Sequence, residues 1–394
     1  MTDVESNPVG SKSNRTVLFL AQMPPPLHGV TTMSKRVRGF MQDMPGVRVE
    51  HMWLGGARTL HDVGKSSIRK VAGFAWLLLR LAGRAISGRR YSMTYQTLAP
   101  HGEAAIRDAL IIGVARWLSP RTLVHLHTQG LDEVLKGKSL SQKFIRYALC
   151  GTELIAISAH VGEAARRSGI FSAVHALPNY VPDPGRLTPE ASPAIRCGYL
   201  GNLDPRKGVL RFVDVVSRMN ADGIAVEGVI AGGPTKHLTT KDLQRYISQK
   251  GAGDFIKAPG FVSEAEKSRI LHGLDFFIYP TDHDLAPLVV LEAMAHGAIP
   301  IVFDTGGLRE MVGVEFQDHV IAEKGNPEVY AGKMVAIVRA ISADPGRLAR
   351  AKETARRHFE LHYTEAVYRS RLASVVDSTP RPELSGVPGI PANA

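Results

Sequence analysis

An α/β fold with two doubly wound domains is predicted by two features of this chain. Short apolar runs alternate with helical patterns throughout, which is typical of parallel sheets with helices on both faces. The stretch LPNYVPDPGRLTPEASP, dense in proline and turn-forming residues, separates the chain into two halves. We therefore expect two domains whose sheets face a cleft between them.

The individual segments follow from the same pattern. The predicted strands are TVLFLAQ, TLVHLHT and ELIAIS in the first half, and AIRCGYLG, IAVEGVIAG, DFFIYP and IPIVFD in the second. We expect an N-terminal domain over 15–182, a linker over 183–193 and a C-terminal domain over 194–360. A C-terminal helix over 361–376 is expected to pack back toward the N-terminal domain. Residues 1–14 and 377–394 are expected to be disordered.

Composition excludes several classes of protein. With 394 residues, 44% of them hydrophobic, the chain is long enough to bury a core in each domain. Cys150 and Cys197 lie far apart, without a neighbouring Cys or His at ligand spacing, so neither a disulfide framework nor a zinc site is indicated. No secretory signal and no run of about 18 apolar residues is visible. We expect a cytoplasmic protein.

The net charge of +11 is unevenly placed, since residues 63–102 hold seven Lys or Arg and no acid. Within this segment a predicted helix carries one apolar face, formed by Val71, Phe74, Leu77, Leu78, Leu81 and Ala85. Two interpretations stay open: docking on an anionic membrane, peripherally at the inner face of the plasma membrane, or packing inside the first domain with basic residues outward. Nucleic-acid binding is not indicated, because no aromatic residues interleave with the basic ones.

Residues 277–307, FIYPTDHDLAPLVVLEAMAHGAIPIVFDTGG, carry the most specific pattern. They are predicted to form a buried strand, a polar loop, a helix closed by glycine and a second strand. Asp284 and Glu292 are separated by seven residues, one acid in the loop and the other in the helix. The unpaired amides at the helix N-terminus suit a bound anion or an electron-rich sugar hydroxyl.

This segment resembles the donor-site signature of glycosyltransferase family 4, retaining enzymes with the GT-B fold: Glu-x7-Glu, then AMA-x-G-x-P and a Gly-Gly turn. The resemblance implies two Rossmann-like domains, an acceptor domain followed by a donor domain. It implies that Asp284 lies beside the transferred sugar and that Glu292 hydrogen-bonds the ribose of the nucleotide. It also places Leu285, Ala286 and Leu288 at the donor. Asp284 departs from the family's Glu, which shortens the side chain by one methylene.

Two loops of the N-terminal half take their predicted roles from the same resemblance. The loop MPPPLHGVTTMS matches the family's first loop, where Gly29 would let the backbone approach the donor diphosphate; the residues alone are equally consistent with a stiff turn. In the segment TLVHLHT, the family commonly has a histidine at the position of His127, where the side chain lies against the sugar donor and the acceptor. A core histidine is the alternative, and His125 and His127 are too few to bind a metal.

Loops of the C-terminal half complete the predicted donor site. In GNLDPRKG, Lys207 matches a family lysine that clamps the diphosphate, and Arg206 could assist it. Asn202 occupies the position of the family's arginine, so half of this clamp is changed. The double-glycine turn at Gly232 and the segment around Val262 match the loops that surround the nucleotide, with Val262 near the base.

The predicted function is retaining transfer of a sugar, in a hexosyltransferase-like reaction, from a nucleoside diphosphate sugar to a glycan or lipid-linked glycan in surface polysaccharide synthesis. No cofactor or metal is expected: residues 282–284 match a DxD metal motif of another architecture, but such a short pattern arises often by chance. The alternatives are a GT-B nucleotide-sugar epimerase, or a catalytically weakened membrane-associated scaffold, which Asn202 and Asp284 suggest.

Overall fold

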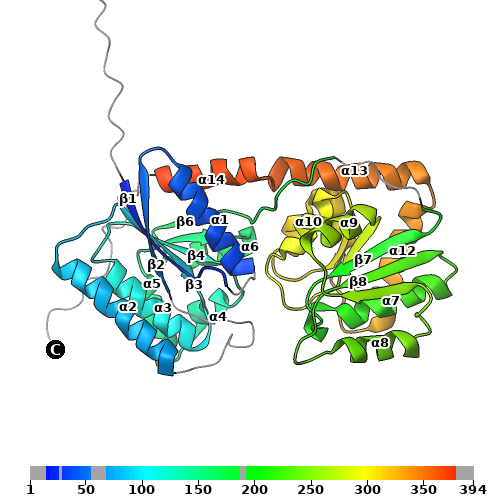
Figure 1. Ribbon diagram of the computed structural model, residues 1–394, viewed down its shortest axis with the longest axis horizontal. Helices are drawn as coiled ribbons and strands as arrows, with labels where there is room; N and C mark the ends of the chain where they lie inside the picture. Colours follow the sequence, from blue (N-terminus) through cyan, green and yellow to red (C-terminus); the bar gives the residue numbers. More distant parts are fainter. Residues whose placement is uncertain (1–14, 26–28, 55–67, 187–191, 379–394) are drawn as a thin grey trace, which may run out of the picture. The chain divides into compact units, whose positions relative to one another are not determined.

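The computed structural model describes residues 15–25, 29–54, 68–186 and 192–378, which form two compact units (Figure 1). Among the described residues, those up to 156, 162–175 and 373–378 belong to the N-terminal unit, and 157–161 and those from 176 to 372 belong to the C-terminal unit. Of the segment 183–193, predicted as a linker, residues 183–186 and 192–193 are described and belong to the C-terminal unit. The predicted disordered ends were 1–14 and 377–394. Residues 1–14 and 379–394 lie outside the described residues, whereas Asp377 is the last residue of a helix, so the prediction is wrong at that position.

The N-terminal unit is built on a six-stranded sheet with the order β2-β1-β3-β4-β5-β6. Its strands are β1 (Arg15–Ala21), β2 (Val47–Trp53), β3 (Met93–Leu98), β4 (Thr122–Leu126), β5 (Glu153–Ala156) and β6 (Ala173–Ala176). Its helices are α1 (Gly29–Asp43), α2 (Ile68–Ile86), α3 (Gly102–Ala115), α4 (Leu131–Lys136), α5 (Leu140–Leu149) and α6 (Ala159–Ser168). Helix α1 lies on one face of the sheet, and α2, α3 and α5 lie on the other (Figure 1).

The C-terminal unit has a second six-stranded sheet, ordered β12-β11-β10-β7-β8-β9. Its strands are β7 (Ile195–Leu200), β8 (Val226–Ala231), β9 (Ile256–Gly260), β10 (Phe276–Tyr279), β11 (Ile299–Phe303) and β12 (Val320–Ile321). Its helices are α7 (Val209–Ala221), α8 (Thr240–Gln249), α9 (Glu264–Gly273), α10 (Leu288–Ala295), α11 (Leu308–Val312), α12 (Pro327–Ser342) and α13 (Pro345–His362), and α14 (Glu365–Asp377) follows. Strand order reverses between β7 and β10, which pair in parallel.

This reversal decides where a ligand fits. In an open parallel sheet, the loops after the two central strands diverge to opposite faces and leave a crevice at the carboxyl ends of the strands. Strands β10 and β11 are buried along their whole length, as their apolar sequences FFIY and IPIVF require. The rigid sheet thus holds the ends of β7 and β10 side by side.

The predicted apolar face of α2 packs inside the N-terminal unit along most of its length, but not at Val71. Leu77 and Leu81 are buried against Leu18 and Leu20 of β1, and Phe74, Leu78 and Ala85 are half-buried. Val71, however, is 63% exposed. The packed part of the helix begins one turn after this residue, so its first turn extends beyond the apolar residues that the sheet offers.

Glu153 makes the stability of the N-terminal unit depend on pH. Its buried carboxylate accepts hydrogen bonds from Arg121, at 2.7 and 2.8 Å, and lies 2.8 Å from His175 Nε2. Burial alone would raise the pKa of Glu153, but these partners lower it to about 2. Because the folded pKa is depressed, this stabilisation is present above pH 4.5 and is lost as the pH falls toward 2.

We therefore expect the free energy of unfolding of the wild-type protein, measured in urea, to fall between pH 5 and pH 3. The fall should be smaller in Glu153→Gln, which has no proton to take up at this position. Glu133→Gln removes an exposed carboxylate and serves as the control, with a wild-type slope expected. Equal slopes for Glu153→Gln and the wild type would contradict this assignment.

Candidate functional site

A cation and a carboxylate meet where the sheet of the C-terminal unit reverses its strand order. Lys207 follows β7 and Asp284 follows β10, and Lys207 Nζ lies 3.2 Å from Asp284 Oδ1. The other carboxylate oxygen accepts hydrogen bonds from Tyr279 Oη at 2.7 Å and Thr281 Oγ1 at 3.3 Å. Burial, followed by the nearby negative charge of Asp284, raises the pKa of Tyr279, so the phenol stays a hydrogen-bond donor. Asp284 is therefore held in one orientation, toward the ammonium group.

The local sequence explains how Lys207 reaches this place. Asp204 caps the short turn Pro205–Lys207 by accepting from the backbone N–H of Arg206. Gly208 then adopts φ 86°, in the left-handed region, and α7 begins. A Cβ atom on Gly208 would lie 2.1 Å from the carbonyl oxygen of Pro280. The loops after β7 and β10 therefore contact each other directly, and the positive end of the α7 dipole lies next to Lys207.

Arg206 and Asn202 are arranged differently from Lys207. The guanidinium of Arg206 donates to both oxygens of Asp204, at 3.1 and 2.7 Å. Asn202 is exposed, and its backbone carbonyl accepts from the N–H of Asp204 at 2.7 Å. Of the two cations predicted to bind the diphosphate, the structure brings Lys207 into contact with Asp284, while Arg206 pairs within its own loop.

Glycines let four turns approach one another at this edge. A Cβ atom on Gly232 would lie 1.8 Å from the carbonyl oxygen of Gly201, which directly follows β7. A Cβ atom on Gly306, where φ is 55°, would lie 2.5 Å from the carbonyl oxygen of Asp284. The turns after β7, β8, β10 and β11 are thus packed backbone against backbone, which leaves no room for side chains at these positions.

Substitution of Gly232 should disturb this packing. We expect Gly232→Ala to lower the free energy of unfolding by about 1–3 kcal/mol, because the new methyl group forces two backbone segments apart. Gly253→Ala is the matched control, since a Cβ atom there would meet nothing within 4 Å. Urea unfolding measures both, and equal stability of the two variants would contradict the close approach.

Glu292 lies in the middle of α10 and pairs with a different lysine. Lys267 Nζ, from α9, lies 3.0 Å from Glu292 Oε1 and 2.8 Å from Glu264 Oε2. Burial acts to lower the pKa of Lys267, but the two carboxylates outweigh it, so the pKa is raised. Val262 is half-buried in the segment that leads into α9. Glu292 is therefore connected to the segment of Val262 through α9.

The remaining predicted donor residues of this unit lie in the loop after Asp284 and at the start of α10, where backbone hydrogen bonds hold the loop. The carbonyl of Leu285 accepts from the N–H of Gly307 at 2.7 Å, and the carbonyl of Ala286 accepts from Asn179 Nδ2 at 3.2 Å. Leu288 opens α10 after Pro287. These bonds fix the loop between Asp284 and the helix, so both acids are placed by one continuous, well-bonded segment.

Two predicted residues, His127 and Gly29, belong to the N-terminal unit. His127 follows β4, is half-buried, and its ring centroid lies 3.9 Å from that of His125. His125 is fully buried and hydrogen-bonded to Tyr95 Oη at 2.6 Å, and burial holds its pKa well below the usual value. Gly29 opens α1, and a Cβ atom there would meet nothing within 4 Å. Packing against the described part of the chain therefore does not require glycine at this position.

The two acids of the DxD pattern face different cations. Asp282 lies 2.6 Å from Arg211, whereas Asp284 lies beside Lys207. In the part of the chain that the structure describes, no group of three His, Cys, Asp or Glu side chains could hold a metal ion.

Four contributors to this site were not predicted from the sequence. They are Asp204, Tyr279 and Thr281, which orient the cation and the acid, and Lys267, which pairs with Glu292. Tyr279 and Thr281 lie at the end of a predicted strand, next to a predicted site loop, and this position could have identified them as contributors to the site. Lys267 gave no signal, because it lies 25 residues from Glu292 in the sequence.

The C-terminal unit is similar in sequence to proteins of known activity. Residues 194–340 match the family model described as glycosyl transferases group 1. Starch synthase 2 of Arabidopsis thaliana is 32% identical over 117 residues, which is 29% of this chain and 14% of that protein. Glycogen synthase 1 of Geobacter sulfurreducens is 29% identical over 124 residues, 32% of this chain and 24% of that protein. The match thus spans less than a quarter of each relative.

Solved structures resemble the whole chain at low identity. The lipopolysaccharide outer core galactosyltransferase WaaB has a TM-score of 0.67 at 16% identity, with 92% of this chain and 99% of that chain covered. Sucrose-phosphate synthase from Thermosynechococcus elongatus has a TM-score of 0.69 at 13% identity, with 92% and 98% covered. Anabaena HepE, solved with UDP and glucose, has a TM-score of 0.62 at 16% identity, with 93% and 100% covered. The chain therefore has the GT-B fold, and its residues 194–340 match a group 1 glycosyl transferase domain.

Proposed function

We propose that this protein is a retaining, metal-independent glycosyltransferase that moves a sugar from a nucleoside diphosphate sugar to a glycan or lipid-linked glycan, in surface polysaccharide synthesis. The observation that carries the proposal is the Lys207–Asp284 pair at the strand-order reversal of the C-terminal unit. Two similar structures support the donor and acceptor classes: HepE was solved with UDP-glucose, and WaaB is a lipopolysaccharide galactosyltransferase.

Each residue has a role in this proposal. Lys207 and the N-terminus of α7 stabilise the negative charge that develops on the departing diphosphate. Asp284, oriented by Tyr279 and Thr281, holds the ammonium group in place and accepts from a sugar hydroxyl. Glu292 accepts from the ribose hydroxyls, and His127 contributes from the N-terminal unit. The leaving phosphate serves as base on the same face of the sugar, so no enzymatic nucleophile is assigned.

The test is release of nucleoside diphosphate from a panel of UDP, GDP and ADP sugars, with and without EDTA, in the presence of lipid-linked acceptor extracts. We expect release from one donor, unchanged by EDTA. An anomeric analysis of the product by NMR should give the configuration of the donor. No release from any donor would contradict transferase activity, and release that EDTA abolishes would contradict the metal-independent mechanism.

We also propose peripheral binding to an anionic membrane at the inner face of the plasma membrane. Helix α2 exposes Trp76 (64%), Leu79 (66%) and Ile86 (88%), with Arg80 exposed on the same helix. Apolar side chains beside basic ones are typical of helices that lie in the headgroup region. Within the described residues, no helix is long and apolar enough to cross a bilayer.

The double variant Trp76→Glu, Leu79→Glu should bind vesicles of anionic phospholipid about tenfold more weakly than the wild type, because it removes two exposed apolar side chains that would enter the headgroup region and adds negative charge. Leu361→Glu, at a 57% exposed position of the C-terminal unit, is the matched control and should bind normally. Vesicle sedimentation measures this. Unchanged binding of the double variant would assign the exposed face of α2 to another role.

A further inference from the structure

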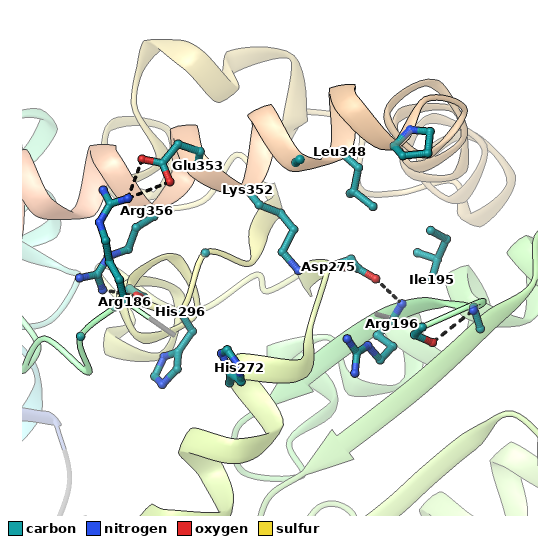
Figure 2. Close-up of a pocket in the computed structure, with 17 residues that line it drawn as sticks. Arg186, Ile195, Arg196, His272, Asp275, His296, Leu348, Lys352, Glu353 and Arg356 are labelled. Carbon is teal, nitrogen blue, oxygen red and sulfur yellow. Dashed lines mark hydrogen bonds and ion pairs between the residues drawn. The ribbon is translucent and has the colours of Figure 1, made fainter. Parts of the chain in front are cut away.

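Ion pairs line the pocket at the start of β7 in the C-terminal unit. The pocket has a volume of about 600 Å³ and lies between β7, the C-terminal ends of α9 and α10, and one face of α13 (Figure 2). Lys352 Nζ lies 2.9 Å from Asp275 Oδ1, and Arg186 Nη1 lies 2.9 Å from Glu353 Oε1. Both pairs join α13 to other parts of the unit, so these charges stabilise the fold and are compensated within it.

Three neighbouring helices of the N-terminal unit expose apolar side chains on their outer side. Helix α3 contacts both α2 and α5, and all three helices lie on one face of the sheet (Figure 1). The exposed residues Trp76, Leu79 and Ile86 of α2 have counterparts on the two other helices. These are Ile106, Leu110 and Trp117 on and directly after α3, and Leu140, Phe144 and Tyr147 on α5. We call these nine residues the outer helical face.

The spacing along α5 shows that this helix is apolar on two sides. Leu140, Phe144 and Tyr147 recur at helical spacing, so they share one side of the helix and are exposed. Ile145 and Leu149, on the other side, are buried. A helix that packs on a sheet needs only its inner side to be apolar. The outer apolar side is therefore available to a partner outside the chain.

Basic residues accompany the outer helical face. Residues 71–90, 102–117 and 138–147 hold nine Lys or Arg and two acids, Glu103 and Asp108. Asp108 is buried and lies 2.7 Å from Arg107. On each helix an exposed cation adjoins an exposed apolar residue: Arg80 follows Leu79, Arg116 precedes Trp117, and Lys143 precedes Phe144. The same surface is therefore both apolar and positively charged.

This combination identifies the kind of partner. A bilayer that contains anionic lipid offers hydrocarbon to the aliphatic side chains, a headgroup layer to Trp and Tyr, and negative charge to Lys and Arg. A second copy of the chain, docked through the same face, would bring like charges together. A nucleic acid would leave Leu79, Leu110 and Leu140 without apolar contacts, because its backbone is polar and charged.

We infer that the whole outer helical face, and not α2 alone, docks on an anionic bilayer. The inference rests on the membrane binding proposed above and extends it to α3 and α5. The sheet of the N-terminal unit then lies parallel to the membrane, because the helical layer that contacts the lipid covers one face of the sheet. The carboxyl end of β4, which His127 follows, opens along the membrane surface, where a lipid-linked acceptor presents its glycan.

The three tryptophans of the chain report on this orientation. Trp76 and Trp117 belong to the outer helical face, whereas Trp53, which is 45% exposed, ends β2. Met52 belongs to the core that includes Leu81 of α2, and side chains alternate along a strand, so Trp53 points to the opposite face of the sheet. We prepare full-length variants that keep one tryptophan and replace the other two by Phe. Phosphatidylglycerol vesicles with brominated acyl chains should quench the fluorescence of Trp76 and Trp117 and leave that of Trp53 unchanged.

A double variant tests α5 separately. Leu140→Glu, Tyr147→Glu removes two exposed apolar side chains and adds negative charge, while α2 stays intact. Sedimentation with phosphatidylglycerol vesicles should show about tenfold weaker binding than for the wild type. Leu361→Glu is again the matched control, with wild-type binding expected. The thermal midpoint of each protein without vesicles verifies folding.

Quenching of Trp76 without quenching of Trp117, or wild-type binding of the α5 double variant, would overturn the inference and leave membrane binding through α2 in place. Equal quenching of Trp53 and Trp117 would overturn the orientation. Equal binding of the wild type to neutral phosphatidylcholine vesicles would overturn the choice of an anionic surface. Absence of binding to any vesicle would overturn the inference together with the membrane proposal, whereas transferase activity is decided separately by the release of nucleoside diphosphate.

Discussion

Lys207→Ala should reduce kcat/KM for sugar transfer by about 100- to 1000-fold, the effect typical of removing one preorganised group that stabilises developing negative charge. The loss should appear mainly in kcat, because the charge on the leaving diphosphate is largest in the transition state. Asp284 keeps its hydrogen bonds from Tyr279 and Thr281 in this variant, so the loop should retain its conformation. Steady-state kinetics with the donor that the panel identifies measures the change.

Lys241→Ala is the matched control for this experiment. Lys241 lies on the exposed surface of α8 in the same unit, so its removal changes the net charge equally without touching the proposed site. We expect wild-type kinetics from it. A Lys207→Ala enzyme that retains more than about a third of wild-type kcat/KM would contradict the role of Lys207.

Glu292→Gln should raise the KM for the donor by about 10- to 100-fold and change kcat much less. A hydrogen bond to a charged group contributes about 1.5–3 kcal/mol, and the ribose does not change during the reaction, so its loss weakens ground state and transition state alike. Lys267 keeps Glu264 as a partner at 2.8 Å, so no cation is left unpaired.

Lys267→Met separates this role from a structural one. If Glu292 served only to connect α10 to α9, loss of Lys267 should raise the KM as much as Glu292→Gln does. We expect a clearly smaller effect, because the carboxylate of Glu292 remains available to the ribose. Equal effects of both substitutions would assign Glu292 to packing rather than to the donor.

Sequence patterns predicted the parts of the fold that rest on apolar periodicity. The runs that became β1, β7, β10 and β11 are almost entirely apolar, and burial on both faces of a parallel sheet requires this. Strand β3 was missed because its sequence MTYQTL is largely polar, although every residue is buried. Two of its polar side chains are hydrogen-bonded inside the unit: Thr94 to Ser119, and Gln96, through its Nε2, to the carbonyl of Asp108. Such hydrogen bonds join residues that are distant in the sequence, so no local sequence pattern predicts them.

For the candidate site too, the sequence predicted one part and missed another. The contact of Lys207 with Asp284 follows from two motifs placed at the ends of adjacent strands, which the topology brings together. The pairing of Arg206 with Asp204 decides which of two adjacent cations lies beside Asp284, and it depends on the geometry of a single turn. Side-chain direction in a loop is set by such local bonds, so the sequence alone could not separate the two residues.

A crystal structure of the protein with the nucleoside diphosphate of its preferred donor would test the central claim most directly. We predict the diphosphate within hydrogen-bond distance of Lys207 Nζ and the N-terminus of α7, and the ribose hydroxyls at the carboxylate of Glu292. A nucleotide bound elsewhere, or one whose ribose faces away from Glu292 while its phosphates lie apart from Lys207, would contradict the assignment of this edge of the sheet as the donor site.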